Sequence, residues 1–88
     1  MAEVESLEAA GNYVRVTSGG RSLLMRSSLS ELDSRLDPEQ FARVHRSTIV
    51  NLDEVRQITP HMSGDYQLLL SSGRVLRRSR HYRRRLLP

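Results

Sequence analysis

Short turns that contain glycine divide this chain into stretches rich in β-branched and apolar residues, and they constrain the fold more than any other feature. Gly11 and Asn12 separate two such stretches and favour the positive φ angles of a tight hairpin. Further turns, composed of serine and glycine, are expected at residues 18–20 and 71–73. We therefore expect a chain of β-hairpins.

The stretches between these turns define the expected strands. They are Val4–Ala10, Tyr13–Thr17, Arg21–Arg26, Phe41–Val44, Thr48–Asn51, Glu54–Thr59, Tyr66–Leu70 and Arg74–Arg78. The first three follow one another closely enough to form a meander, and the apolar run Leu23, Leu24, Met25 indicates that the third is buried. From Phe41 to Thr59 we expect β structure throughout, interrupted by one polar tip, and residues 60–64 are expected to form a loop.

One amphipathic helix is expected between the third and fourth strands. Ser28, followed three residues later by Glu31, forms a capping box at its start, and Pro38 lies beyond its end. Its apolar face consists of three leucines at spacings i, i+3 and i+7, namely Leu29, Leu32 and Leu36. This stripe predicts a helix that packs on the sheet, and a groove for a partner is the alternative.

The charge of the chain is unevenly distributed. Residues 1–65 hold seven arginines against ten acidic residues, whereas residues 66–88 hold seven arginines and no acid, so the net charge of +4 is the sum of −3 and +7. The absence of lysine fits either a GC-rich genome or selection for guanidinium chemistry, but the clustering needs its own cause. A basic end on a small domain is typical of a polyphosphate partner, and a solubilising tail is the alternative.

Several classes of protein are excluded by composition. The chain has no cysteine, so no disulfide or thiolate metal site is expected, and no apolar run is long enough to span a membrane. The acidic residues among the first ten do not form a signal peptide. The three histidines are scattered without the spacing of metal ligands, and no nucleotide-binding loop or activated nucleophile is present. We expect one cytoplasmic domain over residues 1–88, without catalysis, cofactor, metal or membrane contact.

The polar tip lies within the segment FARVHRSTIVNLDEV, where His45, Arg46 and Ser47 interrupt two β-prone stretches. An imidazole, a forked guanidinium and a hydroxyl suit base edges or phosphates better than a core. A solvated turn is the alternative, and the acidic Asp53 and Glu54 are near enough in sequence to pair with Arg46. We call residues 45–47 the HRS turn.

The end of the chain has the pattern of a short helix over Arg80–Leu87. Ser79 is a plausible N-cap, and Tyr82 and Leu86 are spaced to form an apolar contact. Three arginines crowd the positive N-terminal end of this helix, where cations are unfavourable: Arg77, Arg78 and Arg80. A phosphate site explains this conflict, since a helix N-terminus already offers backbone N–H groups to an anion.

Three blocks of the sequence, in order, resemble the LytTR family of bacterial DNA-binding domains: LEAAGNYVRV at residues 7–16, FARVHRSTIVNLDEV at residues 41–55, and GRVLRRSRHYRRRL at residues 73–86. The resemblance implies an elongated, mostly β fold of antiparallel sheets with one central helix and a short C-terminal helix. It also implies the output half of a response regulator, with a receiver domain outside this chain. Such domains insert loops into successive major grooves of duplex DNA to regulate transcription, typically as homodimers on paired half-sites.

The resemblance also assigns roles to particular residues. Three loops would contact bases, through Asn12, Tyr13, His45, Arg46, Arg80 and His81; the family commonly has arginine near the position of His81. Phosphate contacts would come from Ser47, Arg77, Arg78, Ser79, Arg83, Arg84 and Arg85. Two other hypotheses remain open: a nonspecific nucleic-acid binder that depends on the arginine tail alone, and a protein-interaction or dimerisation module.

Overall fold

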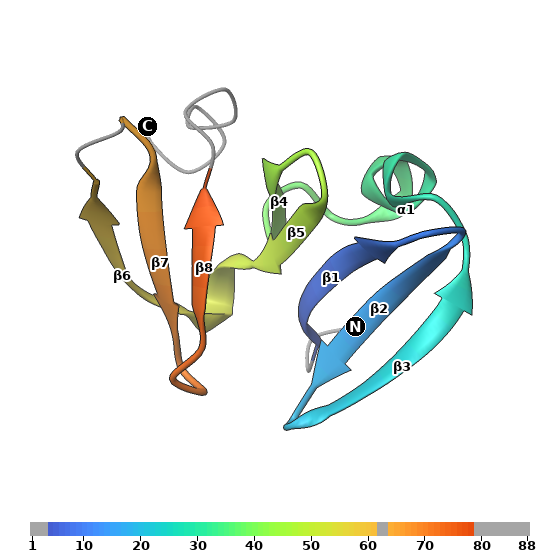
Figure 1. Cartoon of the computed structure of the whole chain (residues 1–88), viewed down its shortest axis with the longest axis horizontal. Helices are drawn as coiled ribbons and strands as arrows, with labels where there is room; N and C mark the ends of the chain where they lie inside the picture. Colours follow the sequence, from blue (N-terminus) through green and yellow to red (C-terminus); the bar gives the residue numbers. More distant parts are fainter. Residues whose placement is uncertain (1–3, 62–63, 79–88) are drawn as a thin grey trace.

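The computed structural model describes residues 4–61 and 64–78, and most of this part of the chain is β structure (Figure 1). The elements in order are β1 (Val4–Ala10), β2 (Tyr13–Ser18), β3 (Arg21–Arg26), α1 (Leu29–Arg35), β4 (Phe41–His45), β5 (Thr48–Asn51), the 3-10 turn η1 (Leu52–Glu54), β6 (Val55–Pro60), β7 (Tyr66–Leu70) and β8 (Val75–Arg78). They form two antiparallel sheets, one of five strands and one of three, in a molecule of 35 × 24 × 23 Å. The expected mostly β, elongated fold is confirmed.

The five-stranded sheet has the order β3-β2-β1-β5-β4, so the predicted meander forms one half of it. Gly11 (φ 64°) occupies the first position of a two-residue turn whose other residue, Asn12, has negative φ, the type II′ pattern. The β2–β3 turn uses Gly19 and Gly20, with φ of 56° and 81°, the type I′ pattern. Both turns match the natural twist of antiparallel strands, which is why glycine is needed there.

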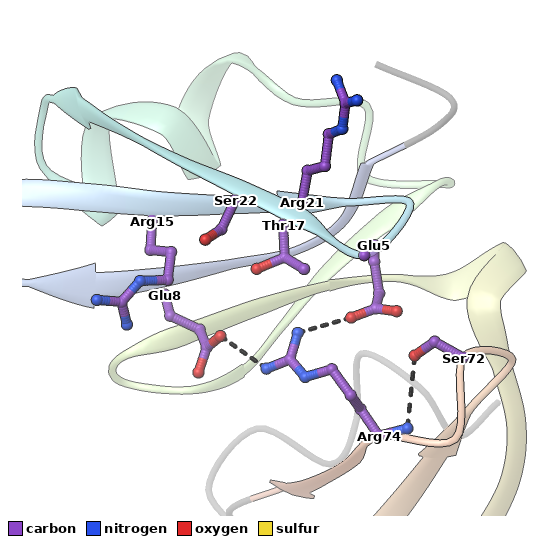
Figure 2. A pocket seen from close by; sticks show the side chains of 9 residues that line it. Glu5, Glu8, Arg15, Thr17, Arg21, Ser22, Ser72 and Arg74 are labelled. Atoms are coloured by element: carbon purple, nitrogen blue, oxygen red, sulfur yellow. Dashed lines mark hydrogen bonds and ion pairs between the residues drawn. The ribbon is translucent and has the colours of Figure 1, made fainter.

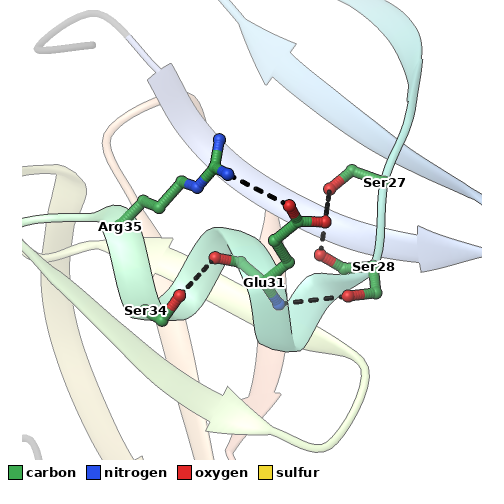
Figure 3. A network of polar contacts seen from close by, with 5 residues as sticks. All are labelled: Ser27, Ser28, Glu31, Ser34 and Arg35. Carbon is green, nitrogen blue, oxygen red and sulfur yellow. Dashed lines mark hydrogen bonds and ion pairs between the residues drawn. The ribbon is translucent and has the colours of Figure 1, made fainter.

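Helix α1 begins where the capping box predicts. The hydroxyl of Ser28 accepts a hydrogen bond from the backbone N–H of Glu31 at 3.1 Å, and the Glu31 carboxylate accepts one from Arg35 at 3.2 Å (Figure 3). Leu29 is buried against β1 and β5. Leu32 and Leu36 are partly buried on the same core. The leucine stripe is therefore core, as predicted.

A second core joins the two sheets. The three-stranded sheet, in the order β6-β7-β8, contributes Leu68, Leu70 and Leu76. From the other sheet come three buried residues of the β4–β5 hairpin: Ala42, Val44 and Val50. The same hairpin gives Phe41 and Ile49 to the core beneath α1. The β4–β5 hairpin is therefore buried on both faces, with the HRS turn at its tip.

Two expectations about the strands are wrong. β3 forms as predicted, but its apolar residues are not buried: Leu23 is 62% exposed, Leu24 54% and Met25 40%. β3 is an edge strand that α1 does not cover, and position in the sheet decides burial here. The second error lies after β5, where η1 interrupts the β structure because the side chain of Asn51 accepts a hydrogen bond from the backbone N–H of Asp53. The expected C-terminal helix lies outside the described residues.

Candidate nucleic-acid interface

The HRS turn is locked by hydrogen bonds between its first and last residues. The backbone N–H of Ser47 donates to Nδ1 of His45 at 3.2 Å, and the Ser47 hydroxyl lies 2.8 Å from the same nitrogen. A backbone N–H can only donate, so Nδ1 must be an acceptor and the ring proton must be on Nε2. The turn therefore holds His45 with its N–H donor on the side of the ring away from Ser47.

Contacts from two other elements hold this turn in place. The Ser47 carbonyl accepts a hydrogen bond at 2.9 Å from the backbone N–H of Ala9, the residue that follows the part of β1 paired with β5. Arg43 donates to the carbonyl of Arg46 and, at 3.1 Å, to the hydroxyl of Ser30 on α1. The conformation of the turn is thus tied to both the sheet and the helix.

Sequence reasoning missed Arg43. Its guanidinium sits at one end of the cross-strand row that continues through Ile49 and Leu7, on the face that α1 covers. The sequence signal for Arg43 is its position two residues after Phe41, which puts both side chains on the same face of the strand. An arginine on a face that packs into the core must reach a polar partner. Arg43 uses the HRS turn and α1 as those partners.

The register of the sheet places two of the predicted contact loops at the same end. Ala10 pairs with Tyr13 across the first hairpin, and Glu8 pairs with Thr48, next to the HRS turn. Asn12 is exposed and Tyr13 is 43% exposed, so both side chains are accessible. The structure therefore brings the first two loops together at the C-terminal end of β1.

Arg46 extends from the tip of the HRS turn and is exposed. Within the described part of the chain, no salt bridge joins it to Asp53 or Glu54, which lie beyond the other end of β5. Its guanidinium is therefore available to a ligand.

The described part of the chain ends close to the third expected loop. Arg77 is exposed on β8 and pairs in register with Gln67, and Arg78 is the last residue of that strand. The remaining predicted contacts lie outside the described residues: Ser79, Arg80, His81, Arg83, Arg84 and Arg85.

One arginine of the basic segment has an internal role that the charge count did not reveal. Arg74, in the β7–β8 turn, donates to the carboxylates of Glu5 at 2.6 Å and Glu8 at 2.9 Å (Figure 2). It also donates to the Ser6 hydroxyl at 3.1 Å. Burial alone would lower the pKa of this guanidinium, but the hydrogen bonds and charges of Glu8 and Glu5 outweigh burial and raise the pKa above its ordinary value. Arg74 therefore joins the two sheets, and its charge is compensated within the protein.

The described part of the chain has neither a metal-binding cluster nor a membrane-spanning helix. Among residues 4–61 and 64–78, no group of three or more His, Cys, Asp or Glu side chains is arranged to hold a metal ion. No helix in this part of the chain has the length and apolar character required to cross a membrane.

Comparison with known proteins identifies the family. The family model described as the LytTr DNA-binding domain matches residues 1–87. This chain belongs to the LytTr family. A solved LytTr DNA-binding domain from a Bacillus cereus regulator superposes with a TM-score of 0.87 at 28% identity, covering 94% of this chain and 76% of that one. The resemblance drawn from the three sequence blocks is thereby confirmed, together with the LytTr fold.

Curated relatives of this LytTr domain are longer proteins. The CO-responsive transcriptional regulator RcoM of Rhodospirillum rubrum is 48% identical over 58 residues, which are 66% of this chain and 25% of the relative. The transcriptional regulatory protein YpdB of Escherichia coli K12 is 41% identical over 72% of this chain and 26% of its own length. The sensory transduction protein LytT of Bacillus subtilis is 30% identical over 84% of this chain and 31% of its own. The LytTr domain thus spans only a minor part of each relative.

Proposed function

We propose that residues 1–88 act as one unit that binds duplex DNA sequence-specifically and regulates transcription. The family match over residues 1–87 carries this proposal. Two of the relatives, RcoM and YpdB, are named as transcriptional regulators, which supports the regulatory role. The proposed binding mode is insertion of three loops into successive major grooves, with arginines gripping the phosphates on either side.

His45 is proposed as the main base-contacting residue of the HRS turn. Its Nε2–H is a donor, and the guanine O6 and N7 atoms in the major groove are acceptors. Arg46 would contact guanine with two parallel hydrogen bonds or bind a phosphate. Ser47 is proposed to contact a phosphate, and in the unbound domain its hydroxyl lies against His45, so this contact would exchange one partner for another.

The other base contacts are proposed for Asn12 and Tyr13 in the first loop and for Arg80 and His81 in the third. Phosphate contacts are proposed for Ser79 and for five arginines that end β8 or follow it in the sequence, namely Arg77, Arg78, Arg83, Arg84 and Arg85. Phosphate contacts set affinity and its dependence on salt, whereas base contacts set the choice of sequence.

The whole protein is proposed to act as a homodimer on paired half-sites, under control of a receiver domain in a longer chain. The lengths of the relatives support the longer chain, since this chain spans 25% to 31% of RcoM, YpdB and LytT. LytT is named as a sensory transduction protein, which fits a signal-receiving segment elsewhere in such chains.

The test begins with selection of bound duplexes from a random pool, followed by affinity measurements on the selected site and on a scrambled duplex. His45→Ala should weaken binding to the selected site by about 1 to 3 kcal/mol, the value of a good base contact, and leave scrambled DNA unaffected. Arg77→Ala should weaken binding to both duplexes and reduce the slope of log affinity against log salt concentration by about one.

Arg56→Ala is the charge-matched control. Arg56 donates a hydrogen bond to the Ser71 hydroxyl at 3.2 Å, beside the β7–β8 turn. This is the end of the three-stranded sheet opposite to Arg78, so the substitution should change the affinity for neither the selected nor the scrambled duplex. Equal affinity of the unmodified domain for selected and scrambled duplexes would refute sequence specificity and favour a nonspecific binder.

A further inference from the structure

The open edge of the five-stranded sheet is unusually apolar. All six residues of β3 are exposed, and Leu23, Leu24 and Met25 form an uninterrupted apolar run along it. The strand pairs with β2 without a register shift and contains no proline. Edge strands are commonly protected by bulges, prolines or a covering element, and β3 has only an arginine at each end.

Two of these residues, Leu23 and Met25, lie opposite Val16 and Val14 and continue the core beneath α1. One cross-strand row runs from Ile49 through Leu7 and Val16 to Leu23. The first two of these side chains are fully buried and Val16 is 9% exposed, whereas Leu23 is 62% exposed. α1 packs on β1 and β5 and stops short of the edge. The apolar face of the five-stranded sheet therefore extends beyond the area that α1 covers.

The β2–β3 turn determines which backbone groups face outward. A type I′ turn joins Ser18 to Arg21 through backbone hydrogen bonding, and antiparallel pairs alternate from there along the strand. Leu23 and Met25 therefore direct their N–H and C=O groups toward β2. Arg21, which pairs with Ser18 across the turn, does the same. The remaining three residues direct these groups to the open edge, namely Ser22, Leu24 and Arg26.

We propose that β3 pairs with β3 of a second copy in an antiparallel arrangement, with Leu24 opposite Leu24 of the second copy. In this register the outward-facing backbone groups meet one another, Leu23 lies opposite Met25, and Ser22 lies opposite Arg26. Apolar side chains meet apolar ones and no arginine opposes an arginine. A shift by two residues would place Arg21 opposite Met25, or Leu24 opposite Arg26.

The symmetry of this pair determines where DNA would lie, a step that rests on the proposed function. Asn12 and the HRS turn are at the end of the sheet where β3 finishes, with Arg26 in register with Tyr13. An antiparallel partner presents the same residues at the opposite end. The β3 pair therefore directs its two DNA-binding ends away from each other and can hold two duplex segments, unlike copies side by side on paired half-sites.

The β3 interface is small. Three apolar side chains and one strand edge per copy amount to less than the roughly 800 Å² per partner of a standard interface. The pair should therefore be weak in dilute solution and become populated when DNA concentrates the copies.

Cysteine cross-linking tests the register directly, because the chain has no native cysteine. Leu23 and Met25 of opposite copies would form a non-hydrogen-bonded pair with Cα atoms about 4.5 Å apart, within disulfide range. Two Leu23 residues would be diagonal neighbours about 7 to 8 Å apart, beyond it. Both side chains are exposed, so neither substitution disturbs the core.

A size-tagged Leu23→Cys variant mixed with Met25→Cys, without DNA, should give several times more mixed disulfide than either variant gives alone. Glu39→Cys, on an exposed residue away from β3, measures random collision. Equal disulfide yields in all combinations would refute pairing of β3 with β3 of a second copy, and would favour a different partner for this edge strand.

The cross-linked mixed dimer, offered two differently labelled duplexes that carry the selected site, should then retain both together. Retention of only one duplex per dimer would overturn the bridging arrangement. Failure of the unlinked domain to bind the selected site would instead refute the proposed function, with the disulfide result unaffected.

Discussion

The ion-pair cluster of Arg74, Glu5 and Glu8 should be a major contributor to the stability of this small domain. Replacing Arg74 with methionine keeps most of its aliphatic stem but removes the guanidinium. The Glu5 side chain is only 6% exposed and would lose its partner at 2.6 Å. The Glu8 side chain, 29% exposed, would lose one at 2.9 Å. A carboxylate would then remain buried between the sheets without its cation.

The size of the effect follows from burial. Removing one member of a fully buried pair costs about 3 to 5 kcal/mol. The Arg74 side chain is 36% exposed and Glu8 can be hydrated, so water already weakens the attraction and the loss should be smaller, about 2 to 3 kcal/mol. For a domain of this size, each kcal/mol lowers Tm by about 4 to 8 °C, so the Tm of Arg74→Met should be lower by about 8 to 24 °C.

Thermal and urea unfolding of a double-mutant cycle would measure this loss. Glu5→Gln alone should cost about 1 kcal/mol, because Glu8 still pairs with Arg74, and the double variant should lose less than the sum of the two single changes. Arg77→Met, which removes an exposed arginine three residues away, should stay within about 0.5 kcal/mol of the unmodified domain. An Arg74→Met variant as stable as Arg77→Met would refute the reasoning.

The pH dependence of this contribution has a definite sign. Because folding raises the pKa of Arg74, the contribution is complete below the pKa of the unfolded chain and is lost only as pH rises through the higher pKa of the folded state, in strongly alkaline solution. The guanidinium therefore adds no slope near neutrality, and the pKa shift predicts a stability difference between the unmodified domain and Arg74→Met that is the same at pH 7 and pH 9. A difference that shrinks over this range would contradict that assignment.

Three further changes test local features. Ser28→Ala removes the N-cap of α1 and should cost about 1 kcal/mol in urea unfolding; an unchanged midpoint would mean that the cap contributes nothing. Gly20→Ala should cost about 1 kcal/mol through its φ of 81° alone, because no atom lies within 4 Å of the added Cβ, and a stabilised variant would contradict this. Arg43→Met should release the Arg46 carbonyl, speed amide exchange at Ser47 and weaken specific DNA binding; unaltered exchange would show that the turn holds without Arg43.

Local patterns predicted the features that short-range chemistry determines. The glycine turns specified hairpins because an L-residue pays a steric cost at positive φ, and the structure has Gly11, Gly19 and Gly20 there. Ser28 and Glu31 marked the start of α1 because the capping bond spans only three residues. The three sequence blocks identified the family, and with it the sheet arrangement that no single pattern contains.

The features that sequence did not predict depend on contacts between distant residues. Leu23 lies in an apolar run typical of a buried strand, and only the order of strands in the sheet places it at an exposed edge. Arg74 resembles its basic neighbours, but its partner Glu5 lies 69 positions earlier in the chain. Arg43 contacts Ser30 across 13 positions. Each contact is created by the fold, so no local pattern could have predicted it.

The two-sided burial of the β4–β5 hairpin limits how this domain can acquire a new DNA preference. Phe41 and Ile49 belong to one core, while Ala42, Val44 and Val50 belong to the other. A substitution on either strand therefore creates a cavity or a clash in one of two well-packed interiors. If the HRS turn contacts bases as proposed, a library that seeks altered specificity should vary residues 45–47 and keep the buried residues of both strands unchanged.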